Sequence, residues 1–101
     1  MSNRKRPTQI TISGRKFRVT QPDKVDSDDS LGDSHVDRRL IQIKAGQTDA
    51  DFESCLLHES LHMMLAISGH NQDLSDDKEE ALVICLEYGL IEMYKRRGSD
   101  N

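Results

Sequence analysis

Two histidines and a glutamate stand close together near the middle of the chain, in the run His58-Glu59-Ser60-Leu61-His62. An α-helix turns once in about 3.6 residues, so positions four apart differ by only about 40° around its axis. His58 and His62 therefore project from one helix face, where they can hold a single Zn²⁺ ion. Glu59 lies on the neighbouring flank, where its carboxylate can take a proton from a water that zinc activates. The pattern predicts a zinc hydrolase with Glu59 as the general base.

A catalytic zinc ion usually has three protein ligands and one open position. We expect the third ligand from the following helix, which offers Glu79, Glu80 and Glu87. Spacing alone does not separate these three candidates. The two that do not bind the metal are expected to be solvated or to complement the helix dipole.

The segment that carries the motif is predicted to be a buried helix. Thr48 is its candidate N-cap and Gly69 its candidate end. Apolar residues occupy nearly every face between them, namely Phe52, Leu56, Leu57, Leu61, Met64 and Leu65. Two histidines and a glutamate in so apolar a helix would be costly without partners. This context favours a metal site over histidines that merely form hydrogen bonds in a core.

The first half of the chain is typical of strands. Ile10 and Ile12 alternate with polar residues, Ser13 and Gly14 form a turn, and the alternation resumes at Phe17, which predicts a β-hairpin. Residues 21–37 are rich in Asp and Ser and are expected to form an exposed acidic loop. A third strand is predicted at Arg39–Ala45, where the residues are β-prone.

A second helix is predicted to begin after Ser75 and to end near Gly98. It carries one apolar stripe, made of Leu82, Val83, Leu86, Leu90 and Met93. The expected fold is α+β: a small antiparallel or mixed three-stranded sheet followed by two helices, with the metal site on the first helix.

Length and charge narrow the class of protein. The 101 residues suit a single domain spanning residues 1–101, in which residues 1–8 are expected to form a flexible tail. Lys and Arg total 14 against 18 Asp and Glu, so the net charge of −4 excludes nucleic-acid binding through a basic surface. Cys55 and Cys85 lie in apolar runs, which favours a reducing cytoplasm, and we expect neither a secretory signal nor a membrane span.

Two further residues are weaker candidates for the metal. His70 follows Gly69, but its spacing differs from that of the longer motif with a third histidine, so we expect a solvated loop residue. Cys55 lies one turn before His58 on a similar face, and a structural cysteine is the more common case.

The run Leu56-Leu57-His58-Glu59-Ser60-Leu61-His62, followed by Glu79-Glu80 and Gly89-Leu90, resembles the short zincin-like proteins encoded by many bacteriophages. It is similar, more distantly, to the ImmA/IrrE-type metallopeptidases. The likeness runs from Arg39 onward and implies a zinc metallopeptidase. In those families a glutamate opening the second helix completes the zinc site, and small or apolar residues follow it. This favours Glu80 as the third ligand. Glu87 stands where a small residue is expected, which keeps Glu79 and Glu87 open.

The resemblance also implies a way of binding substrate. The strand before the metal helix, here Arg39–Ala45, is commonly a sheet edge along which a peptide or protein substrate pairs by strand addition. A purely structural strand is the alternative. The competing function is a non-catalytic, zinc-stabilised phage module for binding or structure. The substrate, the oligomeric state and membership of a virion do not follow from the sequence.

Overall fold

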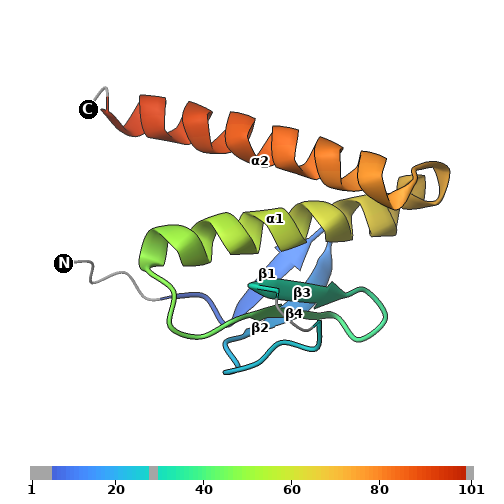
Figure 1. Ribbon diagram of the computed structural model, residues 1–101, viewed down its shortest axis with the longest axis horizontal. Helices are drawn as coiled ribbons and strands as arrows, with labels where there is room; N and C mark the ends of the chain where they lie inside the picture. The colour runs from blue at the N-terminus through green and yellow to red at the C-terminus, as the bar shows by residue number, and fades with distance from the viewer. Residues whose placement is uncertain (1–5, 28–29, 100–101) are drawn as a thin grey trace.

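The computed structural model describes residues 6–27 and 30–99, with side chains described as far as Tyr94 in the last helix. A sheet is followed by two long helices (Figure 1). The strands are β1 (Gln9–Ile12), β2 (Arg15–Thr20), β3 (Gly32–His35) and β4 (Leu40–Ile43). The helices are α1 (Asp49–Ser68) and α2 (Asp76–Ser99), with a 3-10 turn η1 (His70–Asp73) between them. The predicted α+β class is confirmed.

The sheet is mixed, with strand order β1-β2-β4-β3. β1 and β2 form the predicted antiparallel hairpin, in which Ile10 pairs with Phe17. The two turn residues between them, Ser13 and Gly14, have φ values of 50° and 79°. Positive φ at both positions is typical of a type I′ turn, whose twist matches that of the flanking strands. β4 then pairs parallel with β2 and antiparallel with β3.

β3 lies within the segment 21–37, which the sequence predicted to be an exposed loop, so the sheet has one strand more than expected. All four residues of β3, Gly32–His35, are half-buried. Such a strand shows no alternation of apolar and polar residues, because neither of its faces is fully buried or fully exposed. Elsewhere in the segment Val25 is buried, and residues 28 and 29 lie outside the described part of the chain.

β4 is an internal strand, so the predicted edge position of Arg39–Ala45 is wrong. β2 flanks it on one side and β3 on the other, and all four of its residues are buried. A strand enclosed in this way is mostly apolar, as Leu40, Ile41 and Ile43 are, and the one polar residue, Gln42, contacts Asp26 through its side chain. The edge of the sheet that packs beside α1 is β3.

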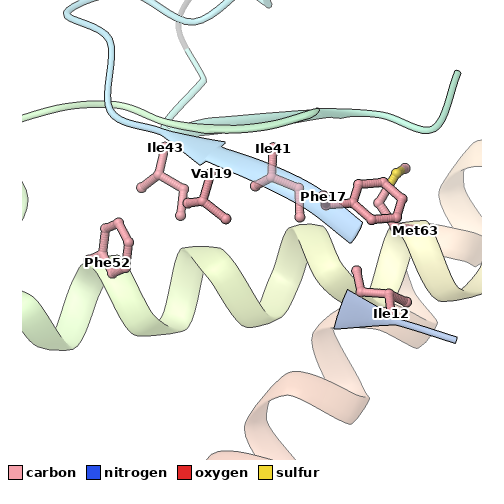
Figure 2. Close-up of a cluster of buried hydrophobic side chains, with 7 residues drawn as sticks. All are labelled: Ile12, Phe17, Val19, Ile41, Ile43, Phe52 and Met63. Atoms are coloured by element: carbon pink, nitrogen blue, oxygen red, sulfur yellow. The ribbon is translucent and has the colours of Figure 1, made fainter. Parts of the chain in front are cut away.

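The apolar core lies between the sheet and one face of α1 (Figure 2). Strands β1, β2 and β4 and helix α1 all contribute to it, through Ile12, Phe17, Val19, Ile41, Ile43, Phe52 and Met63. α2 lies on the other side of α1, so α1 is the middle of three layers (Figure 1). The helix α1 thus packs against two different neighbours, the sheet and α2.

The helix boundaries follow the predicted caps. The Thr48 hydroxyl accepts a hydrogen bond from the Asp51 N–H at 3.1 Å, and Gly69 closes α1 with a φ of 83°. At the start of α2 the Ser75 hydroxyl accepts the Lys78 N–H at 3.2 Å. Within the described residues, neither helix combines the length and the apolar character that crossing a membrane requires.

The described chain begins at Arg6, whose side chain is anchored to the start of α1, and the flexible tail expected over residues 1–8 stays a prediction. The Arg6 guanidinium donates to the Asp49 carboxylate at 2.9 Å and to the Gln47 carbonyl at 2.7 Å. It also lies 4.8 Å from the centre of the Phe52 ring, within the range of a cation–π contact. The guanidinium therefore ties the entry of β1 to the first turn of α1. Residues 1–5 lie outside the described part.

The predicted apolar stripe of α2 is only partly packed. Val83 is fully buried and Leu90 is half-buried. Leu82, Leu86 and Met93 expose 39%, 40% and 58% of their surface, so only part of the stripe is covered. Part of the side that faces α1 is taken by glutamates instead.

Gly32 allows β3 to approach α1 closely. A larger residue at this position therefore tests how the edge strand packs. A Cβ atom at this position would lie 2.5 Å from the Cys55 sulfur and 3.2 Å from the Gln42 carbonyl oxygen. We expect Gly32→Ala to lower the free energy of unfolding by about 1–3 kcal/mol, the usual cost of overpacking. Adding Cys55→Ala should recover part of that loss, because it removes the nearer atom. Urea unfolding of the two single variants and the double variant measures this, and strictly additive effects would contradict the close approach.

Candidate metal centre

His58 and His62 lie one turn apart on α1 and both face α2, as their spacing predicted. Their ring centres are 5.0 Å apart and the ring planes meet at 63°. About a fifth of each side chain is exposed, 21% for His58 and 20% for His62. The two imidazoles thus line one half-open site rather than a closed core position.

Glu80 of α2 brings one carboxylate oxygen to both imidazoles. Its Oε1 lies 3.1 Å from Nε2 of His58 and 2.9 Å from Nε2 of His62. One ligand atom from each of these three residues falls within 4.8 Å of the others. Half of the Glu80 side chain, 51%, is exposed, so the cluster is reached from solvent on the Glu80 side.

The remaining ring nitrogens contact the other two glutamates. Nδ1 of His58 lies 2.8 Å from Oε1 of Glu87, and Nδ1 of His62 lies 2.6 Å from Oε2 of Glu79. Ser54 on α1 also donates its hydroxyl to Glu87. The expectation that two of the three glutamates would be solvated or merely complement the helix dipole is therefore wrong. Only 19% of the Glu79 side chain and 11% of the Glu87 side chain are exposed.

These contacts give the two nitrogens of each ring different roles. A carboxylate beside Nδ1 accepts its proton, and a neutral ring with its proton on Nδ1 has the Nε2 lone pair available for a metal. Burial acts to lower the pKa of His62, but the hydrogen bonds with Glu79 and Glu80 outweigh it and raise the pKa above its usual value. Metal and proton therefore compete for the same Nε2 atoms.

Glu59 reaches the edge strand β3. Its Oε1 accepts a hydrogen bond of 2.7 Å from the Ser34 hydroxyl, and only 9% of the residue is exposed. Burial raises the pKa of Glu59, while the Ser34 hydroxyl and the two histidines act in the opposite direction. Sequence reasoning missed Ser34, since it lies in the segment predicted to be a loop and no local pattern marks it.

A pocket of about 920 Å³ runs between β3 and α1. Residues of β3 form one wall, while His58, Glu59 and His62 from α1 and the three glutamates of α2 form the other side. The volume suits a small molecule or a short stretch of peptide. The histidine and glutamate cluster therefore borders a space that a ligand can enter.

The two weaker ligand candidates do not join the cluster. Cys55 donates its thiol to the Leu31 carbonyl at 3.5 Å, and burial together with the charges of Glu59 and Glu87 raises its pKa to about 11. A thiol with so high a pKa stays protonated at neutral pH and is a poor metal ligand. The side chain of His70 is 74% exposed, with Nδ1 3.8 Å from the Asp73 carboxylate.

The donor set fits a zinc ion. Two imidazole Nε2 atoms and one carboxylate oxygen make up a known catalytic zinc set, with the fourth position open to water or substrate. Carboxylates beside both Nδ1 atoms match the partners that usually orient metal-binding histidines. Among the described residues, His58, His62 and Glu80 make up the one group of at least three His, Cys, Asp or Glu side chains arranged closely enough to hold a metal.

The chain matches no family model, no curated protein and no solved structure at a significant level.

The buried carboxylate of Glu59 makes the stability of the metal-free protein depend on pH. Because the folded-state pKa is raised, folding favours the protonated form, and this contribution is lost as pH rises through the folded-state pKa. Glu59→Gln stays neutral, so it should unfold at a higher temperature than wild type at pH 7. The difference should shrink toward zero below the usual glutamate pKa of about 4.3. Thermal unfolding in EDTA at several pH values measures it, and a difference that grows on acidification would contradict this.

Proposed function

We propose that this protein is a zinc-dependent hydrolase, specifically a metallopeptidase, with Glu59 as its general base. The main support is that the two nitrogens of each imidazole ring, in His58 and in His62, contact different glutamates of α2. Both Nε2 atoms converge on one oxygen of Glu80, while Glu87 and Glu79 occupy the Nδ1 atoms. This arrangement leaves both Nε2 atoms facing one point, as two histidine ligands of a single metal ion require.

In the proposed site His58, His62 and Glu80 hold the ion, while Glu87 and Glu79 orient the two rings. When bound, zinc would lower the pKa of a water molecule toward about 7 and polarise the carbonyl of a substrate. These residues supply the positions and the negative charge that a divalent cation requires.

The role of Glu59 follows from its place between the cluster and β3. The Ser34 hydroxyl holds one carboxylate oxygen, and the other takes a proton from the attacking water and passes it to the leaving amine. The raised pKa of Glu59 suits this role, because a base works best when its pKa lies nearer the working pH.

We propose a peptide or protein substrate that pairs with the edge strand β3, in place of the internal strand expected from the sequence. At this edge the backbone N–H of Ser34 donates to the Asp33 carboxylate at 2.9 Å, a contact that a pairing peptide would have to replace. β3 also forms a wall of the pocket over its whole length. An extended peptide added to this edge would run past Glu59 and the histidines.

One observation favours the alternative, a non-catalytic zinc-stabilised module of a phage. Every ring nitrogen of His58 and His62 has a carboxylate partner, so the cluster joins α1 to α2 even when protons replace a metal. A bacteriophage origin and a place in the cytoplasm of a bacterial host remain part of our proposal. The free thiols of Cys55 and Cys85 are consistent with a reducing compartment.

Metal binding is tested by removing each group of contacts in turn. Wild-type protein should bind close to one zinc ion per chain, and His58→Ala should abolish this. Glu87→Gln should weaken zinc affinity by about 10–100-fold, since it disturbs only the partner of Nδ1. Glu92→Gln, an exposed glutamate of the same helix, is the matched control. Elemental analysis and competition with a chromophoric chelator measure these effects, and wild-type protein that takes up no added zinc would refute the proposed site.

Catalysis is tested at Glu59. Glu59→Gln should retain zinc and fold, yet lose cleavage of a fluorogenic peptide library by a factor of at least about 100, as expected for loss of a general base. Glu92→Gln again serves as the control. If wild type and Glu59→Gln bind zinc equally and neither cleaves any peptide, the non-catalytic module is the correct function.

A further inference from the structure

α2 exposes more apolar surface than a helix packed on one neighbour usually does. Of the nine large apolar side chains that are exposed among the described residues, six belong to α2. They are Leu82, Ile84, Leu86, Tyr88, Met93 and Tyr94. Apolar side chains exposed singly are common on protein surfaces, whereas a continuous row of them marks an interaction site.

Part of this surface has the spacing of a helix–helix contact. Leu82, Leu86, Gly89 and Met93 follow one another at intervals of four, three and four residues, and all four are exposed. Apolar residues at alternating intervals of three and four form a continuous seam on which a second helix packs. We call these four residues the α2 seam. Leu86 and Met93 lie six positions after Glu80 and Glu87, or about 120° around the helix, so a partner on the seam need not displace those two glutamates. Glu79 lies nearer the seam, about 20° from Leu86 around the helix, but it is two turns before Leu86 and its carboxylate is held against His62.

We propose that the α2 seam pairs with the α2 seam of a second copy of this chain, antiparallel and related by a two-fold axis. In this arrangement Leu82 packs against Met93 of the partner subunit, and Leu86 packs against Gly89 of the partner subunit. The second pair is complementary in size, because a Cβ atom at Gly89 has no heavy atom within 4 Å in one chain. The space above Gly89 is thus free to accept a leucine.

The charges at the two ends of α2 favour pairing with a second copy of the helix in the antiparallel direction. α2 begins with Asp76 and Asp77, two acidic residues outside the histidine cluster, and the sequence of its last turns contains the basic stretch Lys95-Arg96-Arg97. An antiparallel pair places the acidic start of each helix beside the basic end of the other, at both ends of the seam. A parallel pair would place like charges together, which disfavours it.

The first test is the mass of the full chain in solution, measured in EDTA so that the outcome does not depend on the proposed zinc site. Sedimentation equilibrium should give twice the mass of the chain. Gly89→Leu should raise the dissociation constant by roughly tenfold or more, because it overpacks the seam of the dimer. It should leave the helix content of the monomer intact, since leucine is the better helix former.

A second, compensating substitution makes this test more specific. The double variant Leu86→Ala/Gly89→Leu exchanges the large and small residues across the two-fold axis, so it should recover much of the dimer that Gly89→Leu loses. Tyr88→Ala, an exposed apolar position off the seam, is the control and should remain a dimer. A wild-type chain that stays monomeric up to about 1 mM, where even weak association of about −4 kcal/mol would register, overturns the proposal. A dimer lost in Tyr88→Ala but kept in Gly89→Leu overturns it as well.

Direction is tested by cross-linking in a Cys55→Ala/Cys85→Ser background. Leu82→Cys and Met93→Cys proteins should each fail to form a disulfide alone, and should form one when mixed and oxidised, because the antiparallel seam places position 82 opposite position 93. Disulfides within each protein alone would indicate a parallel pair and overturn the arrangement.

Discussion

The carboxylates of Glu79, Glu80 and Glu87 on α2 contact all four ring nitrogens of His58 and His62 on α1. Among the described residues, α2 packs against α1 and makes no substantial contact with the sheet, and its apolar side chains that are buried or half-buried are Val83, Leu90 and Ile91. The orientation of α2 therefore depends on this polar cluster. Breaking one half-buried charged contact leaves its partner without compensation, which costs more than the contact itself contributes.

The charge of the cluster constrains what it can hold. Four carboxylates lie in or beside it, those of Glu59, Glu79, Glu80 and Glu87. Two protonated imidazoles or one divalent cation with two neutral imidazoles supply the same positive charge. The same side-chain arrangement can thus be kept with protons or with a metal, so the metal-free fold does not have to differ from the metal-bound one.

The edge strand connects this cluster to the rest of the sheet. Gly32 lets β3 approach α1 closely, and two residues later the Ser34 hydroxyl reaches Glu59. The carboxylate proposed as the base is therefore held by the strand proposed to receive the substrate. A change in the position of β3 would move both together.

Local patterns in the sequence were enough to predict much of the framework and the centre of the site. Ser13-Gly14 marked the hairpin, Thr48 and Gly69 marked the ends of α1, and the spacing of His58 and His62 placed them on one face. Each of these depends on neighbours within a few residues. Periodicity and capping act over that range, so they can be read without knowing the fold.

Contacts between distant segments decided the rest. β3 is a strand because β4 and α1 flank it, and β4 is internal because β2 and β3 pair with both of its sides. The distinct contacts of Glu79, Glu80 and Glu87 depend on how α2 is rotated against α1, and so does the exposure of Leu82, Leu86 and Met93. These residues of α2 all have ordinary helical spacing in the sequence, so spacing alone did not distinguish their contacts. The sequence by itself therefore determined which side chains could carry the chemistry, and only the packing of β3, α1 and α2 decided which of them meet.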